Sequence, residues 1–300
     1  MSARPPTQLD YVVVDVFTRT ALTGNPLAVV FDSAGLATEH MQAIAREFNL
    51  SETTFVQRRE SAQEQAEGVR VRIFTTQEEL PFAGHPTLGT ASALKLRAPE
   101  TLRGDTITLA LNVGPIPVRF ETGSVLFGEM TQRDPEFGAE LDPATVATLC
   151  GLQLDDLDAS APPRVVSTGT AFAIVVLRSA DALSRLRVKQ DEATSWLRER
   201  GARWFYVLGP TGSEAPDYRA RMQFYGGEDP ATGSAAGCAI SHLVHRGKVA
   251  TGQRIHLRQG EAMLRPSDLF LTAKREGARV TDVRVAGSTV LVAEGRLFLP

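Results

Sequence analysis

Short apolar stretches separated by turn residues dominate the first 130 positions. Segments rich in Val, Ile, Phe and Thr predict β-strands at residues 11–17, 27–31, 53–56, 69–74, 107–111, 116–120 and 125–130. A helix is predicted at residues 38–48, because four apolar residues there share one helical face: Met41, Ile44, Ala45 and Phe48. Short strands with few helices favour an α+β fold with antiparallel sheets over a doubly wound parallel one.

A polar segment at residues 131–141 (TQRDPEFGAEL) separates this pattern from a second one and is a candidate linker. Asp142 and Pro143 then have the composition of a helix start, and Gly151 that of a helix stop. Further elements are predicted as a helix at residues 191–200 and strands at 164–166, 171–177, 204–208, 219–225, 290–293 and 297–299. We therefore expect an N-terminal lobe, residues 1–130, to which the last strands near 290–300 could return, and a C-terminal lobe, residues 131–300.

The two halves also resemble each other in sequence, at offsets of 144 to 149 positions. The matching words are residues 24–30 (GNPLAVV) with 169–175 (GTAFAIV), 70–73 (RVRI) with 219–222 (RARM), and 85–91 (HPTLGTA) with 229–235 (DPATGSA). Three matches in one order at nearly one offset indicate an internal duplication. The sequence thus predicts two pseudo-symmetric lobes, each with strands around a central helix that begins at an X-Pro-x-x-Gly-(Thr/Ser)-Ala word.

Composition restricts the function classes. The chain has 300 residues, of which 43% are apolar and 22% charged, the balance of a globular protein with a substantial core. Lys and Arg total 32 against 35 for Asp and Glu, which argues against a nucleic-acid partner or an acidic membrane surface. The N-terminus does not resemble a signal peptide, and the longest apolar run, residues 171–177, is too short to span a bilayer. We therefore expect a cytoplasmic protein.

Metal and disulfide chemistry find little support in the sequence. Cys150 and Cys238 have no close Cys or His neighbour, which argues against a disulfide framework or a zinc site. His242 and His245 lie three positions apart without an evident third ligand. No metal site is therefore predicted.

The two helix-start words have a composition that suits anion binding. The first turn of a helix has unpaired N–H groups and a partial positive charge. Gly89 and Gly233 would allow a ligand close to the backbone, and a hydroxyl residue follows each. Two such starts facing each other across a lobe interface would form a cleft for a carboxylate. Close packing of a buried helix is the alternative for either word, but it does not require the titratable residues His85 and Asp229 at matching positions.

Several words spread along the chain carry a resemblance to a known family. They are Asp15-Val16-Phe17, Gly24-Asn25-Pro26, residues 49–56 (NLSETTFV), 82–87 (FAGHPT) and 228–235 (EDPATGSA). Together they resemble the phenazine-biosynthesis isomerase-like family, within the diaminopimelate-epimerase-like superfamily. The resemblance implies two lobes, each a β barrel around a central helix, with the active site between them. It also implies proton transfer without a cofactor, and a homodimer.

Carried over by motif, the family's acid/base carboxylate falls on Glu52, and the other site groups fall on Gly84, His85, Asp229, Gly233 and Ser234. A base that removes a proton from carbon needs a pKa raised toward neutrality, which partial burial of a carboxylate provides. Glu52 lies at a strand start between Leu50 and Phe55, a setting that allows such burial; a solvated surface turn is the alternative.

The second half of the duplication has no counterpart of the candidate catalytic base, Glu52. The region that matches Glu52 contains Arg203 and Trp204 and no carboxylate. One carboxylate can move a proton between two carbons on one face of a substrate, which describes an isomerase better than an epimerase. Epimerases of the superfamily use two cysteines, and neither helix-start word contains one. Cys238 is expected to lie in the core, so a two-thiol racemase is disfavoured.

The remaining site residues have two interpretations each. His85 would act as a general acid or fix the protonation state of the substrate, unless it is a structural histidine. Asp229 would pair with His85 or with a substrate amine, or cap the following helix. Ser234 and the N–H groups near Gly84 and Gly233 would bind a carboxylate.

These roles predict a cofactor-independent isomerase of a small carboxylate substrate. The family's type reaction is isomerisation of trans-2,3-dihydro-3-hydroxyanthranilate. The alternatives are an epimerase of an amino-acid-like substrate and a non-catalytic binding protein for a carboxylate metabolite.

Overall fold

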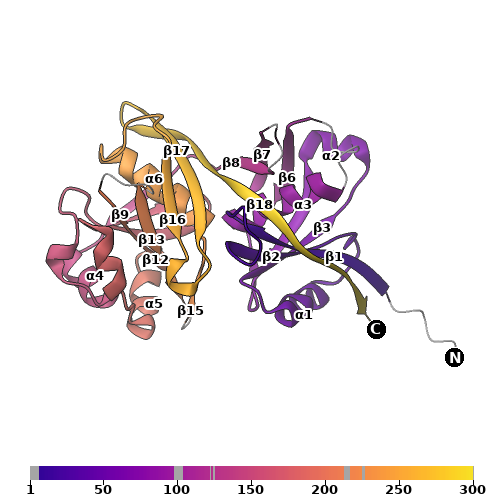
Figure 1. Cartoon of the computed structure of the whole chain (residues 1–300), viewed down its shortest axis with the longest axis horizontal. Coiled ribbons are helices and arrows are strands. Elements are labelled where there is room, and N and C mark those ends of the chain that lie inside the picture. Colours follow the sequence, from indigo (N-terminus) through magenta and orange to yellow (C-terminus); the bar gives the residue numbers. More distant parts are fainter. Residues whose placement is uncertain are drawn as a thin grey trace. The chain divides into compact units, whose positions relative to one another are not determined.

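The computed structural model describes residues 7–97, 104–121, 123, 126–212, 217–224 and 227–299. The chain forms two compact units. Unit 1 extends to Met130 and also includes the chain from Ser288 onward, and unit 2 comprises Thr131–Gly287. Each unit has its own central helix, α3 in unit 1 and α6 in unit 2 (Figure 1).

Unit 1 contains a closed ring of eight strands, in the order β1-β2-β3-β4-β6-β7-β8-β18, with β18 pairing back onto β1. The strands are β1 (Thr7–Val16), β2 (Asn25–Val30), β3 (Glu52–Gln57), β4 (Val69–Phe74), β6 (Thr106–Leu111), β7 (Gly114–Phe120), β8 (Phe127–Thr131) and β18 (Arg279–Leu299). A short strand, β5 (Glu79–Leu80), pairs with β4 outside this ring. Two helices, α1 (Thr38–Phe48) and α2 (Ser61–Glu67), connect strands of the ring.

The central helix of this barrel is α3 (Gly84–Arg97), which contacts β1, β2, β3, β6 and β7. Its residues 84–94 are all buried. A Cβ at Gly89 would lie 2.6 Å from a Leu27 methyl and 2.7 Å from a Val16 methyl. Gly89 therefore serves the close approach of α3 to two strands, and the expectation that it admits a ligand was wrong.

Unit 2 contains a further sheet in the order β9-β10-β11-β12-β13-β16-β17-β18. Its strands before β18 are β9 (Glu136–Glu140), β10 (Arg164–Ser167), β11 (Ala171–Val176), β12 (Trp204–Pro210), β13 (Tyr218–Arg221), β16 (Ile255–Gln259) and β17 (Ser267–Glu276). The buried helix α6 (Gly233–His245) packs on β10, β11 and β17. The remaining elements are α4 (Pro143–Cys150), α5 (Gln190–Arg198), the strand pair β14 (Gln223–Phe224) and β15 (Gly227–Glu228), and 3₁₀ turns at Leu154–Asp156, Ala180–Arg185 and Glu261–Met263.

The internal duplication is visible in the strand pairing of the two units. From β1 to β7, neighbours pair antiparallel, parallel, antiparallel, parallel and antiparallel. From β10 to β17 the five pairings follow the same order. The register agrees as well: Leu27 lies opposite Glu52, and its sequence match Phe172 lies opposite Trp204. Trp204 thus occupies the position in unit 2 that Glu52 occupies in unit 1.

Local sequence signals gave several correct elements. The helix predicted at residues 38–48 is confirmed, with Met41, Ile44 and Ala45 buried. The Asp142 side chain accepts a hydrogen bond from the backbone N–H of Thr145 and caps α4, as predicted.

Two local predictions were wrong. The linker segment contains β9, a charged strand at the end of the sheet order, where unpaired edges tolerate such residues. The two strands predicted near the C-terminus are one, because Glu294 and Gly295 stay paired with β1. Parts of two other predicted strands, at Val125 and Tyr225, lie outside the described residues.

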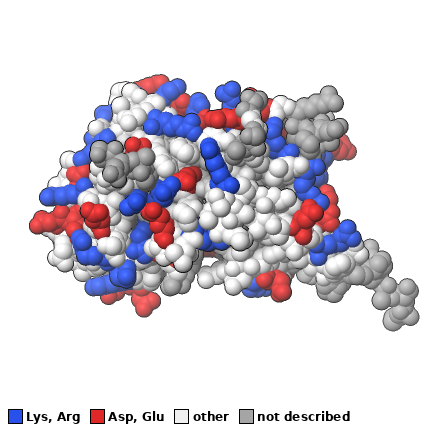
Figure 2. All heavy atoms as spheres, viewed as in Figure 1, with Lys and Arg blue, Asp and Glu red and all other residues white. Residues whose placement is uncertain are grey.

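The surface of the molecule is of mixed charge on the face in Figure 2, where positive and negative side chains are interspersed. That face presents no broad patch of one sign to a charged partner. Within the described ranges, no helix combines the length and the apolar character that crossing a membrane requires.

Candidate active site

Glu52 and His85 lie side by side in unit 1. Glu52 begins β3, and His85 is the second residue of α3. Thr54, two residues after Glu52, accepts a hydrogen bond from Thr90 of α3 at 2.8 Å. Residues two apart lie on the same face of a strand, so Glu52 also faces α3. Oε2 of Glu52 is 3.5 Å from Nε2 of His85, and their side chains are 15% and 3% exposed. A carboxyl group and an imidazole thus meet in a nearly buried position.

Asn25 orients the His85 ring. Asn25 shares one face of β2 with Leu27, which packs against α3, so its side chain reaches the helix start. Its Nδ2 lies 3.1 Å from Nδ1 of His85. The Asn25 amide thus contacts the ring nitrogen that lies away from Glu52, while Nε2 faces the carboxyl group. The sequence contained this residue within a family word but gave it no role.

Burial keeps His85 neutral. It lowers the pKa of His85 from 6.5 to about 3, against a smaller opposing effect of the Pro26 carbonyl. The contact with Glu52 therefore joins a carboxyl group to a neutral ring and is no ion pair at neutral pH. A neutral imidazole has one N–H donor and one acceptor nitrogen. This state favours the second predicted role of His85, which is to fix the substrate, over proton delivery from an imidazolium.

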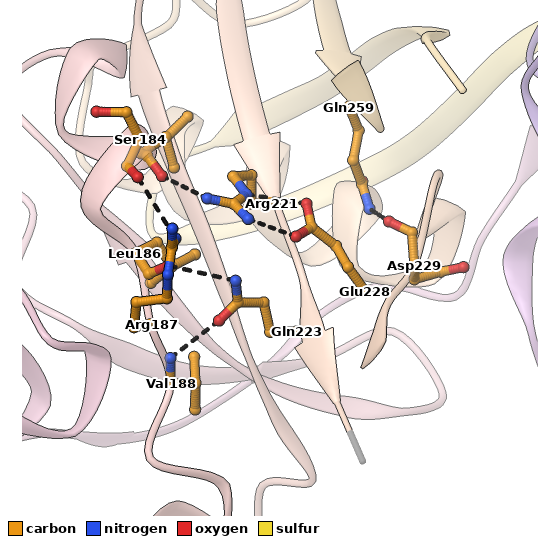
Figure 3. Close-up of polar contacts among 10 residues, drawn as sticks. Ser184, Leu186, Arg187, Val188, Arg221, Gln223, Glu228, Asp229 and Gln259 are labelled. Carbon is orange, nitrogen blue, oxygen red and sulfur yellow. Dashed lines mark hydrogen bonds and ion pairs between the residues drawn. The ribbon is translucent and has the colours of Figure 1, made fainter. Parts of the chain in front are cut away.

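Asp229 lies in the loop before α6 and is 7% exposed. Thr232 is the N-cap residue of α6, so Asp229 does not cap that helix. Its Oδ2 accepts from the Thr232 hydroxyl at 2.6 Å, and its backbone N–H donates to the Met222 carbonyl at 2.9 Å. Its own carbonyl accepts from the Gln259 amide at 2.8 Å (Figure 3). The position of Asp229 is thus fixed through both its backbone and its side chain.

The strands that lead into Asp229 are anchored by partly buried polar contacts, shown in Figure 3. Arg221 and Glu228 form a two-pronged ion pair at 2.5 and 2.9 Å, with side chains 14% and 11% exposed. A further Arg221 nitrogen donates to the Leu183 carbonyl at 2.7 Å. The Gln223 side chain accepts from the Val188 N–H at 2.9 Å. A bidentate pair of this kind fixes geometry as well as charge.

The other predicted site residues lie at the two helix starts. Gly84 is the first residue of α3, and Gly233 and Ser234 are the first two of α6. The N–H groups of a first turn have no partner within their helix and favour an anion. Pro86 removes one such donor from α3. Substrate binding by these groups stays a prediction, as does the expectation that the two helix starts face one ligand.

Cys238 is placed in the core of unit 2, as predicted. It is fully buried, and burial raises the pKa of its thiol to about 12. Thiolate chemistry requires a lowered pKa and access to the substrate, so Cys238 is unsuited to proton transfer. Among the residues that the structure describes, no group of three or more His, Cys, Asp or Glu side chains could hold a metal ion.

Comparison with known proteins identifies the family. Residues 14–295 match the family model described as phenazine biosynthesis-like protein. The chain belongs to this family. It is 37% identical over 301 residues to the trans-2,3-dihydro-3-hydroxyanthranilate isomerase of Pseudomonas aeruginosa, an alignment that covers 96% of this chain and 99% of the relative. The corresponding isomerase of Pseudomonas fluorescens is 35% identical over 302 residues, which cover 97% and 99% of the two chains.

Solved structures agree with the sequence matches. A Pseudomonas aeruginosa structure described as a predicted epimerase superposes with a TM-score of 0.82 at 36% identity, covering 96% of this chain and 99% of that one. A hydroxyproline epimerase from Agrobacterium vitis shares the fold alone, with a TM-score of 0.69 at 10% identity over 99% of this chain and 93% of that one. The predictions of the family, the two-lobed α+β fold class and an enzyme of the isomerase class are confirmed.

Proposed function

We propose that this phenazine biosynthesis-like protein is a cofactor-independent isomerase that moves a proton, and with it a double bond, in a small carboxylate substrate. The observation that carries the proposal is the contact between Glu52 and His85, 3.5 Å apart in a nearly buried position. A carboxylate placed beside a neutral donor can exchange a proton with carbon while the donor orients the substrate. The substrate class follows the relative at 37% identity, which is named for trans-2,3-dihydro-3-hydroxyanthranilate.

The proposed reaction needs one base and no net oxidation. The carboxylate of Glu52 takes a proton from one carbon, and the electrons of that C–H bond form a new double bond. The protonated Glu52 exchanges its proton with solvent, and the displaced π electrons of the existing double bond then accept a proton from it at a second carbon. Glu52 returns to its carboxylate form, and substrate and product are isomers.

The asymmetry of the duplication supports a single base. Trp204 occupies the position that matches Glu52, opposite Phe172 in the β11–β12 register. Inversion of a stereocentre by two bases would require a proton donor on the opposite face of the carbon. Cys238, the cysteine near the α6 start, is buried with a pKa of about 12. These features favour proton movement on one face over epimerisation.

The helix starts supply the proposed binding groups. The first-turn N–H groups at Gly84 and Gly233, with the Ser234 hydroxyl, would bind the substrate carboxylate. Asp229 would pair with a substrate amine, because its carboxylate is the acidic group at the α6 start. We also propose a homodimer, following the family resemblance; sedimentation equilibrium tests it, and a monomer at assay concentration would contradict it.

Proton exchange tests the function directly. The protein is incubated in D₂O with trans-2,3-dihydro-3-hydroxyanthranilate and, separately, with a panel of small amino acids, and each C–H signal is followed by NMR. We expect deuterium to enter the dihydro-hydroxyanthranilate product at the carbon that gains the proton. Saturable binding without exchange on any compound would instead indicate a binding protein. Exchange with inversion of an amino-acid stereocentre would indicate an epimerase.

A further inference from the structure

Gln259 is a buried amide in which every hydrogen-bonding position is used. It ends β16, where Ile255, Leu257 and Gln259 alternate on the buried face of the strand, and it is 1% exposed. A polar side chain at a core position costs free energy unless all its groups are paired. A buried glutamine at such a position therefore indicates a specific set of partners.

The partners of Gln259 fix which way its amide points. Its Oε1 accepts from the backbone N–H of Thr232 at 3.1 Å and from the Tyr206 hydroxyl at 2.9 Å. Its Nε2 donates to the Asp229 carbonyl at 2.8 Å and to the Thr232 hydroxyl at 3.0 Å. A backbone N–H can only donate and a carbonyl can only accept, so the reversed amide would lose both of those bonds.

These hydrogen bonds all donate in one direction, from Tyr206 toward Asp229. The Tyr206 hydroxyl is fully buried, and burial raises its pKa well above the usual value, so it remains a donor. Tyr206 donates to Gln259, and Gln259 donates to the Thr232 hydroxyl. That hydroxyl has its oxygen occupied as an acceptor, so its hydrogen is directed to Oδ2 of Asp229 at 2.6 Å. The series of hydrogen bonds ends on the carboxylate of Asp229, which the proposed function pairs with a substrate amine.

We propose that Gln259, Thr232 and Tyr206 are positioning residues for Asp229. They orient its carboxylate as a hydrogen-bond acceptor toward the substrate. The inference rests on the proposed function for its catalytic consequence, whereas the bonds to Asp229 are present whatever the reaction. The donor to Asp229 is a side-chain hydroxyl, so it can be removed without altering the backbone.

Thr232 offers a matched pair of variants. Thr232→Val keeps the shape and removes the hydroxyl, whereas Thr232→Ser keeps the hydroxyl. We expect Thr232→Val to lower kcat/KM about 10- to 100-fold, the range for a hydrogen bond to a charged group, and Thr232→Ser to remain within about threefold. Thr148→Val, which removes an exposed hydroxyl on α4 in the same unit, is the control and should change nothing. In an Asp229→Asn background, Thr232→Val should cost much less activity than in the wild type, because the carboxylate that it serves is already gone.

A readout without turnover separates this inference from the proposed function. Infrared difference spectra against Asp229→Asn assign the carboxylate stretch of Asp229. We expect that band to shift in Thr232→Val and in Gln259→Met, and not in Thr232→Ser or Thr148→Val. An unchanged band in Thr232→Val would overturn the inference, whatever the activity. An equal loss of activity in the wild-type and Asp229→Asn backgrounds would reduce Thr232 to a structural role and also overturn it. A shifted band in a wild-type protein that exchanges no proton would leave the placement of Asp229 intact and refute the proposed function.

Discussion

The two helix starts carry matching sequence words but are built differently. In unit 1, His85 lies within the first turn of α3, whereas in unit 2 the matching Asp229 lies four residues before α6 begins. His85 is oriented by burial and by the amide of Asn25. Asp229 is fixed by hydrogen bonds through its backbone and its carboxylate. An aligned position in a duplicated fold therefore does not share one conformation or one role.

The strands beside these helices differ in the same sense. Glu52 opens β3 opposite Leu27, whereas Trp204 opens β12 opposite Phe172. Trp204 has an aromatic contact with Phe172, with ring centroids 5.9 Å apart. One copy thus places a carboxyl group where the other places a packing residue. Under the proposed function, this difference places proton transfer in unit 1 and charge recognition in unit 2.

The largest expected effect comes from removing the single carboxylate of this comparison. Glu52→Gln keeps the size of the side chain and removes its basicity, so we expect kcat to fall on the order of 10²- to 10⁴-fold, the usual contribution of a general base. Glu47→Gln, at an exposed position of α1, is the matched control and should retain full activity. Deuterium exchange in D₂O measures both. Full exchange by Glu52→Gln would show that Glu52 is not the base.

A smaller effect is expected from replacing the amide that contacts the His85 ring. Asn25→Asp places a carboxylate, which can only accept, beside Nδ1 of His85, so the ring proton is held on Nδ1 and Nε2 is left as an acceptor that faces Glu52. We expect a loss of kcat of about 10- to 100-fold, the range for a hydrogen bond to a charged group, and ¹⁵N NMR of the ring reports which nitrogen carries the proton in each protein.

Asn49→Asp is the control for this variant, because Asn49 is exposed and its left-handed conformation also suits Asp. Ring nitrogen shifts that place the proton on Nε2 in Asn25→Asp would contradict this effect of position 25 on the ring.

The sequence predicted those elements that are determined by residues close together along the chain. The helix at residues 38–48 follows from the spacing of Met41, Ile44 and Ala45, and the start of α4 from the Asp142 cap, so both could be predicted. Closure of the barrel did not follow from local patterning, because β18 returns to β1 across nearly the whole chain; the barrel was expected from the family resemblance alone.

The residues of the candidate site also differ in whether the sequence could identify them. Glu52, His85 and Asp229 lie in recognisable words, but the roles of Asn25 and Gln259 depend on the direction their side chains point. Gln259 left one usable signal, a polar residue in phase with buried Ile255 and Leu257. Nothing in the sequence near Asn25 marks its contact with His85, since 60 positions separate the two residues.

The smallest expected effect compares the buried histidines of the two central helices. Burial lowers the pKa of His85 in α3 to about 3 and that of His242 in α6 to about 4. Unfolding returns each to about 6.5, so the unfolded chain binds more protons between these values. The stability that each neutral ring contributes is therefore complete above pH 6.5 and is lost as the pH falls toward 4 and then 3. Each histidine should cost about 2 kcal/mol of unfolding free energy between pH 7 and pH 5, from about 1.4 kcal/mol per pH unit of linkage.

Urea unfolding at pH 7 and pH 5 measures this loss in the wild type and in His242→Gln. Glutamine can still donate to the Pro162 carbonyl, which lies 3.1 Å from Nε2 of His242, but it does not titrate. The variant should therefore lose about 2 kcal/mol less than the wild type over that interval, by the same linkage. An equal pH dependence in the two proteins would mean that His242 binds its proton without unfolding. In that case the α6 histidine would differ from His85 of α3, whose pKa burial lowers further.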